Sequence, residues 1–133
     1  MESGNEQALT GNRLQRQTMQ DELALLGRQN GIHFAMLLDL NGQEIATWSR
    51  WANLDHASIS VLAAGEWLAS HAMSWLTTQQ RVCRLLIQEY ETQRMLIAPV
   101  TETMVLLVVT AQDVPIGWAR LHLQRMIEKL RTF

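Results

Sequence analysis

The sequence from His56 to Gln80, HASISVLAAGEWLASHAMSWLTTQQ, contains Glu66 as its only Asp, Glu, Lys or Arg and has no proline. Alanine, serine and glycine fill much of it, and Asp55 or Asn53 precedes it as a candidate cap, so the composition predicts one long helix. With about 100° of rotation per residue, roughly half of the helix circumference is unbroken apolar surface. The residues of this half are Val61, Leu62, Ala64, Gly65, Leu68, Ala69, Ala72, Met73, Trp75 and Leu76.

The other half of the predicted helix also carries apolar residues, whereas a helix of an isolated monomer would be polar there. We infer that the helix needs burial on two sides, one against its own sheet and one against a second copy, which small residues allow to approach closely. The helix residues assigned to this dimer interface are Ile59, Ala63, Glu66, Trp67, Ser70 and Ser74. The alternative is that Glu66 and the serines face water and that Trp67 is a scattered exposed aromatic residue.

The composition indicates a single globular domain. The chain has 133 residues, 47% of them hydrophobic, a formal net charge of -2 and a pI of about 6.1. These values argue against nucleic acid or acidic membranes as partners. The single cysteine, Cys83, excludes an internal disulfide, and we interpret it as a buried, unreactive thiol. Polar residues interrupt the long helix too often for a membrane span, and without an N-terminal secretory signal the expected location is the cytoplasm.

Outside the long helix, the pattern predicts two further helices and five strands. We expect residues 1–10 to be a flexible N-terminal tail and residues 11–133 to form the domain. The first helix is expected at 12–26 and the strands at 32–38, 43–48, 81–90, 93–100 and 103–110. Asn41-Gly42 predicts a two-residue turn between the first two strands, and Asp113 is the candidate cap of a last helix with Pro115 in its first turn.

The element order α-β-β-α-β-β-β-α predicts an α+β fold. We expect a five-stranded antiparallel sheet in the order 2-1-5-4-3, with the central helix on one face and the N- and C-terminal helices on the other. The third strand is then a long exposed edge that is apolar on both faces. Pairing it with its copy covers this edge and brings two central helices together, so Val82, Arg84 and Leu86 complete the predicted dimer interface.

Three segments of the chain resemble the Roadblock family of dynein light chains and bacterial gliding regulators. They are GIHFAMLLDLNGQEIA (Gly31 to Ala46), LDHASISVLAAGEWLAS (Leu54 to Ser70) and LIAPVTETMVLLVVT (Leu96 to Thr110). The resemblance covers about Leu14 to Leu130 and consists of structural patterns rather than catalytic signatures. It implies a homodimer, or a heterodimer with a Roadblock paralogue, that forms through the central helix and the third strand.

The resemblance also implies a partner. Many bacterial members bind small Ras-like GTPases, so this chain is expected to be a regulatory module that modulates the hydrolysis or localisation of such a GTPase. The alternative is a structural adaptor that holds a kinase, a motor complex or another Roadblock protein without changing GTPase turnover. A small-ligand sensor is a third possibility, although no convergent set of polar residues supports it.

Motifs for catalysis or for nucleotide and metal binding are absent from the sequence, so we predict a non-enzymatic protein without a cofactor. GxxxxGK[ST], HExxH and CxxC patterns are missing, and the four histidines are scattered. The candidate GTPase contacts are Trp48, Arg50 and Trp51 in the loop before the long helix. An arginine inserted in trans can stabilise phosphoryl transfer, although a solvated loop arginine is the simpler interpretation of Arg50. Aromatic residues make good interface anchors, although one of the two tryptophans can simply pack under the loop.

Overall fold

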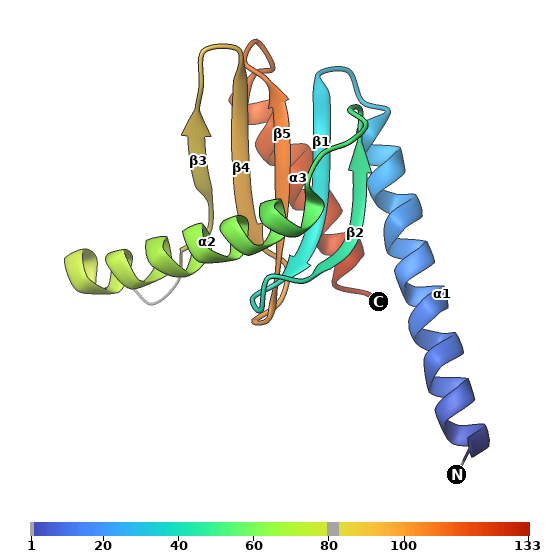
Figure 1. Ribbon diagram of the computed structural model, residues 1–133. Coiled ribbons are helices and arrows are strands. Elements are labelled where there is room, and N and C mark those ends of the chain that lie inside the picture. Colours follow the sequence, from blue (N-terminus) through green and yellow to red (C-terminus); the bar gives the residue numbers. More distant parts are fainter. Residues whose placement is uncertain (1, 80–82) are drawn as a thin grey trace.

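The computed structural model describes residues 2–79 and 83–133, with side chains from Arg13 onward within these ranges. Its elements follow the predicted order (Figure 1). They are α1 (Glu2–Gly27), β1 (Ile32–Asp39), β2 (Glu44–Ser49), α2 (His56–Thr78), β3 (Leu86–Glu89), β4 (Gln93–Pro99), β5 (Met104–Ala111) and α3 (Ile116–Leu130).

The five strands form one antiparallel sheet in the order β2-β1-β5-β4-β3, as predicted. β1 and β5 are central because their apolar residues point to both faces and need cover on both. In β1, all five residues of the run Phe34 to Leu38 are buried. The two central strands pair in a register in which Met36 opposes Leu107.

Helices cover both faces of the sheet, so the molecule has two hydrophobic cores (Figure 1). α1 and α3 pack on the face to which Ala35 and Leu37 point, whereas α2 packs on the face to which Phe34 and Met36 point. Because successive strand residues point to opposite faces, the continuous apolar runs of β1 and β5 supply both cores. This confirms the predicted distribution of the helices.

The turn between β1 and β2 is longer than the two-residue turn predicted from Asn41-Gly42. The amide of Asp39 donates to the carbonyl of Gln43 over 2.9 Å, and the amide of Gly42 donates to the carbonyl of Asp39 over 3.0 Å. The Asp39 carboxylate accepts from the amides of Asn41 and Gln43 at 2.9 and 3.0 Å, and Gly42 has a left-handed φ of 85°. The hairpin is therefore confirmed, but a three-residue loop with glycine at its left-handed position closes it.

Helix α1 begins at Glu2, about ten residues before its predicted start. Residues 2–10, which were expected to be a tail, continue the helix and project away from the sheet (Figure 1). This stretch has no proline, so the helix extends from its packed part, where Met19, Leu23 and Leu26 are buried. The division of the chain into a flexible tail and a domain stays a prediction.

Two further details differ from expectation. Strand β3 has four residues instead of the ten predicted for 81–90, and Arg84 and Leu85 precede it without strand structure. The exposed edge is therefore short, which limits the backbone available for pairing. Pro115, rather than Asp113, occupies the N-cap position of α3 and supplies no side-chain hydrogen bond.

No helix within the described ranges has the length and apolar character needed to cross a lipid bilayer.

Candidate functional site

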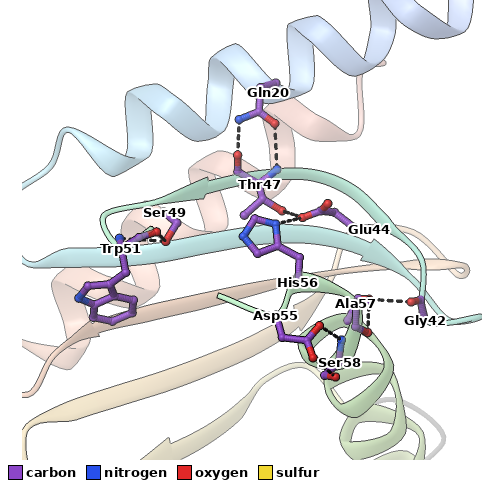
Figure 2. A network of polar contacts seen from close by, with 11 residues as sticks. Gln20, Gly42, Glu44, Thr47, Ser49, Trp51, Asp55, His56, Ala57 and Ser58 are labelled. Carbon is purple, nitrogen blue, oxygen red and sulfur yellow. Dashed lines mark hydrogen bonds and ion pairs between the residues drawn. The ribbon is translucent and has the colours of Figure 1, made fainter. Parts of the chain in front are cut away.

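Helix α2 is fixed to the sheet at its N-terminus. Asp55 caps it as predicted, because its carboxylate accepts from the amide of Ser58 at 3.1 Å. His56 Nδ1 lies 2.7 Å from the Glu44 carboxylate, and the Thr47 hydroxyl donates to that same carboxylate (Figure 2). Gln20 of α1 hydrogen-bonds both backbone groups of Thr47. This network joins α1, β2 and the first turn of α2, so the direction of α2 is well determined.

The inner face of α2 consists of Ser60, Ala63, Ala64 and Trp67, all buried. Small side chains let the helix approach the β1–β2 hairpin closely: the Ser60 hydroxyl is 2.7 Å from the carbonyl of Gly42, to which it donates. A Cβ atom on Gly42 would lie 3.1 Å from the Cα of Val61. Trp67 then fills the space further along the helix, against the second core.

The outer face of α2 is a continuous apolar surface that the sheet of the same chain does not cover. Its large side chains have the exposed fractions Val61 58%, Leu62 67%, Leu68 48%, Met73 60%, Trp75 46% and Leu76 77%. Gly65, Ala69 and Ala72 lie between them and are also exposed. Figure 1 shows that the C-terminal part of α2 extends beyond β3, the edge of the sheet. Contiguous exposed apolar surface of this kind marks an interaction site.

The structure reverses the two faces of α2 that the sequence analysis assigned. Ala63 and Trp67, placed in the dimer interface, are each 5% exposed and pack against the sheet of their own chain. Ile59, Glu66, Ser70 and Ser74 are half-buried at the margins of that inner face. Apart from Ala64, the wide apolar half that was expected on the sheet faces outward, because the small residues Ser60, Ala63 and Ala64 are what fit closely against the hairpin.

Two strand residues of the predicted interface, Leu86 and Arg84, lie on opposite faces of the sheet. Leu86 lies in the edge strand β3 and contributes to the core beneath α2. Arg84 lies on the opposite side of the sheet, beside α3. Val82 lies outside the described residues. Cys83 is half-buried and forms no disulfide, and its thiol is 3.7 Å from the carbonyl of Leu85.

The three candidate GTPase contacts have different environments. Trp48 packs beneath α1: a Cβ on Gly27 would lie 2.1 Å from its indole ring. It is therefore a structural residue rather than a free anchor. Arg50 and Trp51 are exposed in the loop that follows β2. Ser49 fixes this loop, since its hydroxyl oxygen accepts from the amide of Trp51 at 3.0 Å and lies 2.8 Å from the Trp51 carbonyl (Figure 2).

Arg50 lines a polar hollow of about 570 Å³ between the end of α1, the sheet and the start of α3. His33, Asp113 and Trp118 line it as well. The His33 ring lies edge-on to Trp51 at 5.4 Å, and its Nδ1 atom is 3.1 Å from Gln93 Nε2. Burial lowers the pKa of His33 below its usual value, and the positive charge of Arg50 lowers it further, while Asp113 opposes the shift. The imidazole is thus favoured in its neutral form.

The described residues contain no cluster of three or more His, Cys, Asp or Glu side chains that could hold a metal ion. The hollow and its rim offer a guanidinium, a carboxylate, an imidazole and two indoles, which can recognise a protein surface. Sequence reasoning missed His33 and Trp118 because they are far from Arg50 along the chain, and only the pairing of β1 with β2 and β5 brings them together.

No protein-family model matches the sequence, and neither does any curated protein. Solved structures do match. MglB of Myxococcus xanthus superposes with a TM-score of 0.81 at 21% identity, over 86% of this chain and 93% of that chain. The gliding protein mglB of Thermus thermophilus gives 0.79 at 22% identity, over 89% of each chain. A Roadblock/LC7 domain of Streptomyces avermitilis gives 0.74 at 13% identity, over 82% of this chain and 90% of that one. The chain therefore has the Roadblock/LC7 fold that the sequence predicted.

Proposed function

We propose that this chain is a non-enzymatic regulatory module that self-associates through α2, binds a small Ras-like GTPase and modulates its hydrolysis or localisation. The observation that carries the proposal is the apolar outer face of α2 on a Roadblock fold. A helix with six large apolar side chains at least 46% exposed is not expected in an isolated chain. The similarity to MglB, one structure of which has a tetrameric arrangement, supports assembly of several copies.

The proposed dimer interface combines the outer face of α2 with the edge strand β3. Because α2 extends beyond β3, its exposed end can lie over the sheet of a second copy once the two edges pair (Figure 1). Gly65, Ala69 and Ala72 provide the small surface on which two helices can approach closely. The partner in this interface is a second copy or a Roadblock paralogue, and we place the assembly in the cytoplasm.

For the GTPase, we propose Arg50 and Trp51 as contacts. Trp51 is 39% exposed, and its backbone is held by Ser49, so it can bury its indole against a partner without much ordering of the loop. Arg50 lies beside it on the rim of the polar hollow. Because this chain has no nucleotide-phosphate motif, we place the nucleotide site on the partner.

The test is a titration of the purified protein against the small GTPases encoded in the same genome, each loaded with GDP or with a non-hydrolysable GTP analogue. Calorimetry measures binding, and single-turnover hydrolysis measures the change in rate. We expect one GTPase to bind in a nucleotide-dependent way, and Trp51→Ala to weaken binding about tenfold or more, as expected of an interface anchor. Tyr90→Ala, which removes another exposed aromatic residue, is the matched control and leaves binding unchanged.

Two outcomes contradict the proposal. If no GTPase binds in either nucleotide state, the GTPase partner is wrong. If a GTPase binds equally in both states and hydrolyses GTP at its intrinsic rate, the chain is the structural adaptor considered as the alternative.

A further inference from the structure

A second concave surface lies on the sheet face opposite α2, between α3 and the strands at the edge of the sheet. α3 packs against the sheet on the face opposite α2 (Figure 1). Its side chains, the end of β4 at Ala98 and Pro99, and the residues Arg84 and Leu85 before β3 line a groove of about 480 Å³. Apolar side chains line its floor, namely Leu85, Ala98, Leu123 and Ile127.

Arginine side chains line both sides of this groove. Arg84 comes from the segment before β3, Arg120 comes from α3, and Arg131 follows the end of that helix. Arg131 is oriented by its Nε atom, which donates to the carbonyl of Val100 at 2.7 Å. None of the three forms an ion pair with a described carboxylate, and Glu128 is the one acidic residue that lines the groove within the described chain. The groove is therefore basic in a chain whose net charge is -2.

We propose that this groove binds an acidic amphipathic segment of a partner protein. Carboxylates of the segment pair with Arg84 and Arg120, and its apolar side chains contact the floor at Leu85 and Ile127. Guanidinium groups match carboxylates in two-point geometry, which favours arginine over lysine at such a site. The arginines match carboxylates and the apolar lining matches apolar side chains, so the lining as a whole fits an amphipathic acidic peptide. The groove shares no lining residue with the hollow beside Arg50 or with the outer face of α2.

The test uses a fluorescein-labelled helical peptide with leucines at helical spacing flanked by glutamates, and a second peptide in which glutamine replaces every glutamate. Fluorescence anisotropy measures binding to the full chain at low and physiological salt. We expect the glutamate peptide to bind about tenfold more tightly than the glutamine peptide, with the difference falling as salt rises. Arg84→Glu and Arg120→Glu each abolish that difference. Arg125→Glu is the matched control, because Arg125 is on the same helix but lines a different hollow, beside α1.

Circular dichroism and thermal melting establish that each variant is folded. Equal binding of the two peptides overturns the proposal, because the carboxylates then contribute nothing. An Arg125→Glu effect as large as that of Arg120→Glu also overturns it, because the attraction is then not specific to the groove. Phosphatidylserine vesicles provide the third arm. If they co-sediment with the chain in a way that depends on Arg84 and Arg120 while the glutamate peptide does not bind, the groove recognises lipid and the proposal is wrong.

Discussion

Gly27 and Trp48 pack against each other without room for one more carbon atom. Gly27 ends α1 and lies against the indole ring of Trp48 in β2, where a Cβ atom would fall 2.1, 2.3 and 2.5 Å from three ring carbons. We expect Gly27→Ala to lower the free energy of unfolding by about 1–3 kcal/mol, because the ring is packed and must move. Urea denaturation followed by tryptophan fluorescence measures the change.

Gly117→Ala is the control for this prediction, because no atom lies within 4 Å of the Cβ that it would add on α3. We expect its stability to be unchanged or slightly higher, since alanine favours the helix. A Gly27→Ala variant with an unchanged denaturation midpoint would show that Trp48 moves at no cost and that the contact is not structural.

His33 gives a prediction on pH at the same scale. Burial lowers its pKa and Arg50 lowers it further, so the native state binds fewer protons than the unfolded state. Its contribution to stability is therefore present above the unfolded value of about 6.5 and is lost as the pH falls toward the lower native pKa. We expect Arg50→Gln to raise the pKa of His33 part of the way back, since burial remains. NMR titration of the imidazole measures this, and an unchanged pKa would show that Arg50 is too distant to act.

Helix α2 is the element on which the proposed assembly depends. Leu62 is 67% exposed on its outer face, and Leu14, on α1, is 64% exposed. We expect Leu62→Glu to weaken self-association about 100-fold while the chain stays folded, because a two-fold interface contains the new charge twice. Leu14→Glu has the same chemistry on another helix and should leave the dimer intact. Light scattering gives the mass of each variant. Equal masses for both variants would place the interface elsewhere.

The same helix shows what sequence patterns can and cannot predict. Composition and the Asp55 cap predicted its limits and its excess of apolar surface, because both are local properties. Periodicity distinguishes two faces but does not show which one contacts the sheet. That choice depends on the close approach at Ser60 and Gly42, which is a tertiary contact. The short length of β3 was missed for a similar reason. The sequence before Leu86 still looks like a strand, but Arg84 and Leu85 pair with no strand.

At the scale of the whole molecule, the strand order 2-1-5-4-3 and the placement of the helices followed from connection rules and from the doubly apolar β1 and β5. The hollow that joins His33, Arg50 and Asp113 could not be predicted, because its residues come from separate parts of the chain that only the folded sheet brings together. Sequence therefore predicted the architecture, whereas of the residues around this hollow it named only Arg50 and Trp51 as candidate contacts, and their role stays a prediction.

If the chain is a dimer whose monomers are marginally stable, its thermal stability must depend on concentration. We expect the midpoint of thermal unfolding to rise steadily as the protein concentration increases, because association stabilises the native state by mass action. Differential scanning fluorimetry over a wide range of concentration tests this, and Leu62→Glu should abolish the dependence. A midpoint that is constant for the natural sequence would indicate a monomer that is stable alone.

The part of α2 that passes the sheet edge also bears on how the cell handles this protein. If the chain assembles as proposed, a newly made copy that has not yet done so carries Met73 and Leu76 on a helix end that its own sheet does not support. Chaperones and proteases act on apolar surface that stays uncovered. Surplus copies would then be removed while assembled ones persist, so the abundance of the chain would follow the supply of its partner.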